Sequence, residues 1–109
     1  MSLDTNQLAT DMINAMQGVL QDKWPKIKEY GEAESRKLAE SFAMVEKLKL
    51  LNQIDDDEAR LQFTIQKNAS RTVLLTIEGL GVLAAEAAIN AALNVVQDTV
   101  NTALGFTLI

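Results

Sequence analysis

The chain contains neither cysteine nor histidine in its 109 residues. Without cysteine it has no disulfide bonds, no thiolate nucleophile and no thiolate ligands for zinc. Without histidine it lacks the side chain that most often performs acid–base catalysis near neutral pH and most often binds transition metals. Its serines therefore have no imidazole to activate them. We expect no catalytic residues, no cofactor and no metal ion.

Proline, glycine and aromatic residues are also scarce. One proline and five glycines indicate few turns, and hence few and long secondary-structure elements. Aromatic residues make up 5% of the chain although hydrophobic residues make up 48%. An apolar fraction built from alanine, leucine, valine and isoleucine favours helix-on-helix packing over a β-sandwich. The length predicts a single domain covering residues 1–109.

The balance of charge is acidic, with a formal net charge of −5 and no basic tail. Such a chain repels the phosphate backbone, which argues against nucleic acid as a partner. The first residues, Met1 to Thr5, lack the basic and then apolar pattern of a secretory signal. A cytoplasmic location is therefore the default expectation, with export by other routes left open.

Apolar residues recur at helical spacing in the first half of the chain. Leu8, Met12 and Met16 predict a helix over about 5–21, capped by Asp4 or Thr5. Pro25 disfavours helical geometry in the residue before it and suits a first helical turn. We therefore expect a second helix over about 24–51, amphipathic and with a heavily charged outer face.

The third predicted helix is the longest. Asp55 and Glu58 have the spacing of a capping box, and Gly105 suits a left-handed C-cap. They predict a helix over about 56–104 that is continuous, or broken or bent near Gly79 and Gly81. The short connection before it implies an antiparallel hairpin with the second helix. The predicted fold is thus all-α, a long helical hairpin with a shorter N-terminal helix.

The last third of the chain is unusually apolar. From residue 72 to 109 the only charged residues are Glu78, Glu86 and Asp98. Small and large apolar residues form stripes along the predicted helix, and a narrow polar line of Glu86, Asn90, Asn94, Gln97 and Asn101 runs opposite. A helix that is apolar around most of its circumference has to be buried against other helices. A 49-residue helix spans about 73 Å and its hairpin partner about 42 Å, so the far half needs the N-terminal helix, another subunit, or both.

Self-association is the function class that this pattern favours most. We expect a non-catalytic helical oligomerisation or interaction protein, acting as a scaffold, adaptor or assembly component. Its expected partner is a second copy of the chain in a homodimer or higher closed oligomer, or another helical protein. The predicted interface residues are Gly81, Ala85, Ala88, Ile89, Ala92, Leu93, Val96 and Val100.

Two other function classes remain open on the sequence. A membrane-active protein would insert its alanine-rich last helix, although the uncharged runs there are shorter than the roughly 20 residues of a membrane span. A carboxylate-only metal site would use inward acids such as Glu34, Glu78 or Glu86. The acidic run from Asp55 does not match a calcium loop, because its sixth and twelfth positions are Arg60 and Gln66. Gly79 and Gly81 lack the context of a phosphate-binding loop.

Overall fold

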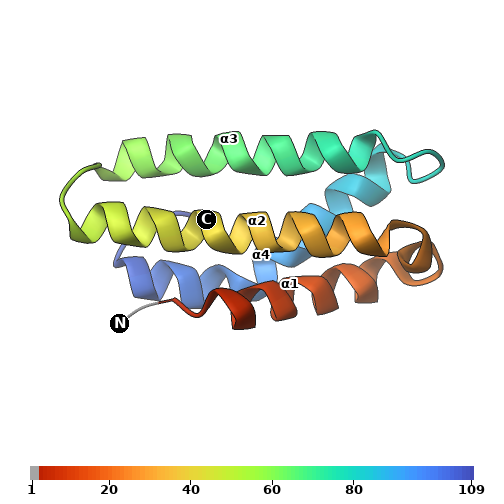
Figure 1. Ribbon diagram of the computed structural model, residues 1–109, viewed down its shortest axis with the longest axis horizontal. Helices are drawn as coiled ribbons and strands as arrows, with labels where there is room; N and C mark the ends of the chain where they lie inside the picture. Colours follow the sequence, from red (N-terminus) through yellow and green to blue (C-terminus); the bar gives the residue numbers. More distant parts are fainter. Residues whose placement is uncertain (1–2) are drawn as a thin grey trace.

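The computed structural model describes residues 3–109 and contains four α-helices within that range. They are α1 (Thr5–Leu20), α2 (Trp24–Leu50), α3 (Asp56–Leu75) and α4 (Val82–Leu104) (Figure 1). A single 3-10 turn, η1 (Gln21–Lys23), joins α1 to α2. No strand occurs in the described range, so the prediction of an all-α chain is confirmed.

The helices run alternately up and down along a bundle whose principal extents are 43 × 22 × 18 Å. Helix α1 packs extensively against α2 and α4, and α2 packs against α3 in the expected antiparallel hairpin. Contact between α3 and α4 is much sparser. Three sides of the bundle are therefore closed, and the side between α3 and α4 is only partly closed.

The helix ends have the capping chemistry that the sequence predicted. The Asp4 carboxylate accepts a hydrogen bond from the Gln7 backbone N–H at 3.1 Å. Asp55 and Glu58 form a complete capping box, with N···O distances of 2.7 and 3.1 Å. Gly105 ends α4 in the left-handed conformation. These bonds satisfy backbone groups that a helix end otherwise leaves without partners.

The joint between α1 and α2 is tightly packed around a single aromatic residue. Trp24 is buried at the start of α2, and Pro25 follows it in the first turn. A Cβ atom on Gly31 would lie 2.6 Å from the Trp24 ring. Glycine at this position therefore makes room for the indole, and α2 starts without a side-chain cap.

The expected helix over 56–104 is two helices. Residues 76–81 break it, with positive φ angles at Gly79 (84°) and Gly81 (87°) that residues with a side chain adopt at a cost. The Lys23 ammonium group donates to the carbonyl oxygen of Leu80 at 3.2 Å, which ties the break to η1. Because the chain reverses here, α4 folds back along α1, and the predicted length mismatch disappears.

The core lies where α1, α2 and α4 meet, with a smaller contribution from α3. Its fully buried large side chains include Met12, Met16, Ile27, Leu38 and Phe42. The Phe42 ring stacks on Phe63 of α3, with ring centroids 4.7 Å apart and planes inclined by 17°. This aromatic pair is the main apolar link between α3 and the rest of the bundle.

Candidate functional site: the exposed sides of helix α3

Seven of the eight predicted interface residues lie inside the single chain. Gly81 is exposed, whereas the others are 9% exposed or less: Ala85, Ala88, Ile89, Ala92, Leu93, Val96 and Val100. Helix α4, which carries them, packs extensively on α1 of the same chain. The sequence allowed for cover by the N-terminal helix, and that helix supplies it. In the folded chain these seven residues are therefore covered, and exposed surfaces lie elsewhere.

Helix α3 is the least buried of the four. Only Ala59, Phe63, Ser70 and Leu74 of its 20 residues are buried. One side of the helix packs on α2, and the remaining sides face solvent or the sparse contact with α4. Its exposed surfaces are therefore the best candidates for a functional site.

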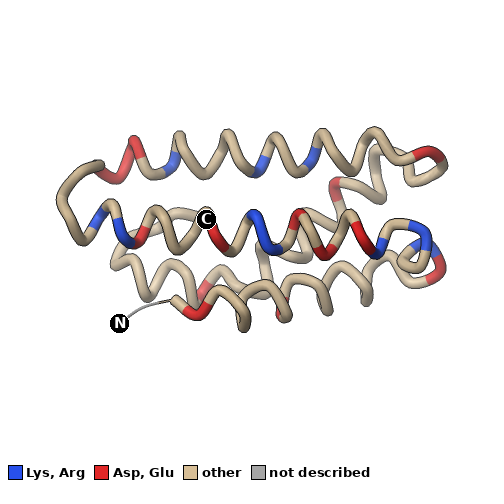
Figure 2. Tube along the Cα trace, viewed as in Figure 1, with Lys and Arg blue, Asp and Glu red and all other residues tan. Residues whose placement is uncertain are grey.

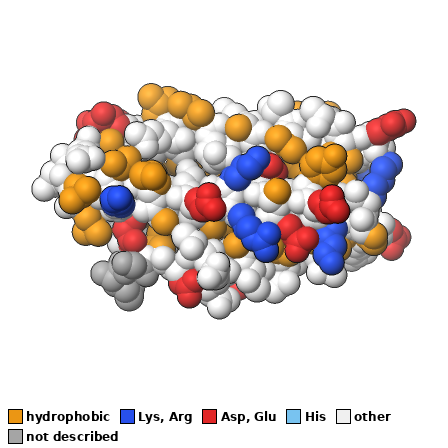
Figure 3. All heavy atoms as spheres, viewed as in Figure 1, with side chains coloured by type: hydrophobic (Ala, Val, Ile, Leu, Met, Phe, Trp, Pro, Cys, Tyr) orange, Lys and Arg blue, Asp and Glu red, His pale blue; other side chains and the backbone are white. Residues whose placement is uncertain are grey.

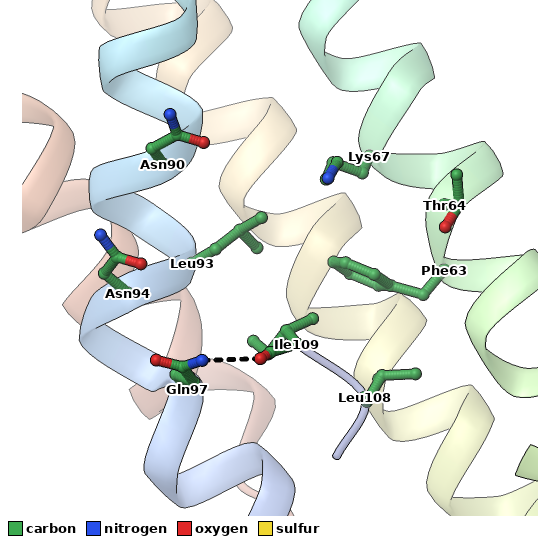
Figure 4. A pocket seen from close by; sticks show the side chains of 9 residues that line it. All are labelled: Phe63, Thr64, Lys67, Asn90, Leu93, Asn94, Gln97, Leu108 and Ile109. Atoms are coloured by element: carbon green, nitrogen blue, oxygen red, sulfur yellow. Dashed lines mark hydrogen bonds between the residues drawn. The ribbon is translucent and has the colours of Figure 1, made fainter.

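A cleft of about 230 Å³ separates the middle of α3 from α4. Phe63 and Leu93 form its apolar floor, while Lys67 and Asn90 point into it from opposite helices (Figure 4). The other residues that line it are Thr64, Asn94, Gln97, Leu108 and Ile109. A second hollow of about 310 Å³ shares Lys67 and Asn90 and extends to Arg71 and Glu86. We call the two together the α3–α4 cleft.

The polar line that the sequence shows on α4 lies along this cleft. At its C-terminal end, the Asn101 side-chain oxygen accepts hydrogen bonds from the backbone N–H groups of Leu108 (2.9 Å) and Ile109 (3.1 Å). The Gln97 side-chain amide donates to the main-chain oxygen of Ile109 at 2.7 Å (Figure 4). The line therefore holds a short segment of the chain's own backbone, and Leu108 is buried beside it.

We expect Asn101→Ala to release residues 107–109 from α4. The substitution removes the acceptor for two backbone N–H groups, and each lost hydrogen bond contributes about 1 kcal/mol. Amide hydrogen exchange at Leu108 and Ile109 should then become about tenfold faster or more. Asn94→Ala is the matched control, because the Asn94 side chain has no hydrogen-bond partner among residues 3–109. Equal exchange rates in the two variants would contradict this assignment.

Basic residues of α3 border the cleft, and most are already paired. Arg71 forms an ion pair with Glu86 of α4 at 2.6 Å. Arg60 donates to the Thr107 carbonyl oxygen at 3.0 Å and lies 5.4 Å from the centre of the Phe106 ring. The Lys67 ammonium group has neither a hydrogen bond nor an ion pair within residues 3–109. Lys67 is therefore the free positive charge of the cleft.

The outer side of α3 carries a second feature. Exposed residues recur there at alternating spacings of four and three, the spacing of a coiled-coil seam. Figure 3 shows a cluster of hydrophobic side chains toward the left of the upper edge, where α3 lies, and mostly polar surface beyond it. Leu61 is 62% exposed and Ile65 is 63% exposed. We call this set the α3 seam: Leu61, Ile65, Asn68, Thr72 and Leu75.

Few charges interrupt the α3 seam. The basic residues of α3 between its ends lie on the cleft side of the helix, and α2 carries more charged residues than any other helix (Figure 2). A groove beside the seam, between α2 and α3, exposes Met44 (53%) and Ile65. The α3 wall of this groove carries the uncharged Gln62 and Gln66, while the α2 wall adds Lys37 and Glu40.

The three carboxylates considered as metal ligands lie in three different environments. Glu34 is buried and forms an ion pair with Lys37 at 3.0 Å, Glu86 pairs with Arg71, and Glu78 is exposed. Within residues 3–109 no three acidic side chains gather as a metal site would require. The described helices also include none with the length and apolar character needed to cross a membrane.

Comparison with family models, with curated proteins and with solved structures finds no match to this chain. Function has to be inferred from the residues themselves.

Proposed function

We propose that the protein is a non-catalytic helical interaction protein that associates with a second copy of itself through the α3 seam. The observation that carries this proposal is the seam itself, an exposed heptad-spaced stripe on the least buried helix. The residues first expected to form the interface are covered by α1, so they do not support it.

The spacing of the α3 seam suits an antiparallel contact about a two-fold axis at Asn68. Leu61 and Leu75 lie seven residues on either side of Asn68, so each faces the other across the axis. Ile65 lies three residues before Asn68 and Thr72 four residues after it, so these two side chains meet offset by one residue, while the two Asn68 amides meet at the centre. A buried asparagine pair of this kind fixes register and oligomeric state in coiled coils at some cost in stability.

Electrostatics favours this face for contact between identical chains. With a net charge of −5, two copies repel each other in most orientations. The α3 seam contains no charged residue, so a two-fold contact there avoids opposing like charges. Its apolar area is small, and we expect a weak dimer that dissociates on dilution.

We expect Ile65→Glu to weaken dimerisation at least tenfold, since the two-fold axis introduces the charge twice, and tenfold corresponds to about 1.4 kcal/mol. Sedimentation velocity over a concentration series up to about 1 mM measures the effect. Val95→Glu is the matched control, because Val95 is 50% exposed on α4. A wild-type chain that stays monomeric throughout the series would refute the proposal.

The absence of cysteine allows a sharper test of the register. A single cysteine at Asn68→Cys should form a disulfide-linked dimer under mild oxidation, because the two-fold axis brings its sulfur atoms together. Val95→Cys supplies the comparison on another exposed face. Equal rates of cross-linking in the two variants would exclude the proposed axis.

A further inference from the structure

Only the C-terminal end of the polar line on α4 makes hydrogen bonds with the backbone of residues 108–109. Asn90, Asn94, Gln97 and Asn101 recur at spacings of four, three and four, which places them on one side of the helix. Gln97 and Asn101 hold the backbone of Leu108 and Ile109. Asn90 and Asn94 face the cleft and have no hydrogen-bond partner among residues 3–109.

The free amides have the chemistry of the occupied ones. A side-chain amide offers two donors and a carbonyl acceptor, so it can pair with both the N–H and the C=O of a peptide backbone. The bonds to Leu108 and Ile109 use both capacities. The chain's own segment thus shows that side-chain amides on this side of α4 can pair with both the N–H and the C=O of a peptide backbone.

The dimensions of the cleft fit a short peptide. From Gln97 to Glu86 the helix rises about 16 Å at 1.5 Å per residue, which an extended chain covers with about five residues. The hollow runs along this length, from Ile109 to the ion pair of Arg71 with Glu86. Phe63 and Leu93 supply an apolar floor for one of its side chains.

The charge of the cleft selects the kind of peptide. Arg71 and Glu86 neutralise each other, and the exposed Arg60 lies by Asp57, with an N···O distance of 3.3 Å. Lys67 is left without a counter-charge and points into the space between the helices (Figure 4). An aspartate or glutamate side chain would provide the missing partner through a charge-assisted hydrogen bond.

We propose that the α3–α4 cleft binds an extended acidic peptide segment of about five residues, held by Asn90 and Asn94 and paired with Lys67. Its backbone pairs with side-chain amides of α4, as the backbone of Leu108 and Ile109 does. The cleft borders the α3 seam at Asn68, so peptide binding and self-association are measured in separate experiments.

The test is a titration of the ¹⁵N-labelled chain with acetyl-Leu-Asp-Leu-Asp-Leu-amide, followed by NMR. The side-chain amide signals of Asn90 and Asn94 should shift, with a dissociation constant of about 1 mM or lower. The same peptide with lysine in place of aspartate should bind at least tenfold more weakly.

Two variants distinguish specific binding from general attraction. Lys67→Gln should weaken the acidic peptide about tenfold, since it removes a charged hydrogen bond. Lys47→Gln, on the exposed side of α2, should leave its affinity unchanged. The proposal is overturned if about 5 mM peptide leaves the Asn90 and Asn94 signals in place, or if both variants bind equally well. Either result leaves the sedimentation test of the dimer unaffected.

Discussion

Phe42→Ala is expected to lower the free energy of unfolding by about 3–5 kcal/mol. Phe42 is fully buried, and its ring stacks on Phe63 across the contact between α2 and α3. The substitution removes a large apolar side chain and leaves a cavity that the helices can fill only in part. Because Phe63 is one of four buried residues of α3, the loss falls mainly on the docking of that helix.

Urea unfolding followed by circular dichroism measures this loss. Tyr30→Ala is the matched control, an aromatic residue of the same helix that is 50% exposed, and it should cost less than about 1 kcal/mol. A loss of similar size in both variants would show that the aromatic pair does not anchor α3. A smaller slope of the Phe42→Ala transition against urea would indicate that α3 is already detached before unfolding.

Ala92→Leu is expected to destabilise the chain by about 3 kcal/mol. Ala92 is fully buried in α4, and α4 makes its most extensive contacts with α1. The larger side chain has no space there, so the helices must move apart or adopt strained rotamers. The effect therefore reports on packing within one chain.

The dependence of stability on protein concentration distinguishes packing of Ala92 within one chain from packing between subunits, which the sequence suggested. If Ala92 packs on α1 of its own chain, the loss should be the same at every concentration. If it lay between subunits, the stability of the wild-type chain would rise with concentration and the variant would remove that rise. Thermal unfolding over a hundredfold range of concentration distinguishes the two. Leu83→Ala, at a residue 84% exposed on α4, provides a control with little expected change.

Most of the fold follows from local rules that the sequence displays. The helical spacing of Leu8, Met12 and Met16 and the capping residues Asp4, Asp55 and Gly105 place the helix ends within a few residues of their observed positions. Caps are short-range interactions between residues close in sequence, which explains why they could be predicted.

The break between α3 and α4 depends on longer-range geometry. Gly79 and Gly81 permit positive φ angles, but glycine also tolerates a helical conformation, so the sequence alone left a continuous helix open. When the backbone turns there, the apolar residues of α4 become buried against α1. In a helix that continued α3 they would lie beyond the end of the hairpin and stay exposed to water. This turn places the predicted interface residues of α4 in the core. It depends on contacts between distant parts of the chain, which a local sequence pattern does not reveal.

The α3 seam was missed for a different reason. Its residues are a mixture of apolar and polar types, and Asn68 and Thr72 interrupt the hydrophobic pattern. Testing the segment 60–75 for alternating spacings of four and three, rather than for continuous hydrophobicity, would have revealed it. The α3–α4 cleft could not be found in this way, because it joins residues of two helices whose distance the sequence does not specify.

The sparse contact of α3 has a consequence for how the molecule opens. Helix α3 lies between two connections, residues 51–55 and 76–81, and buries four residues, whereas α1, α2 and α4 share most of the core. We therefore expect α3 to separate from the bundle at a lower free energy than the other helices, which can stay assembled when it does. The α3 seam lies on this segment, and the α3–α4 cleft has α3 as one of its two walls. Any partner that holds α3 in place would therefore stabilise the chain where its own packing is weakest.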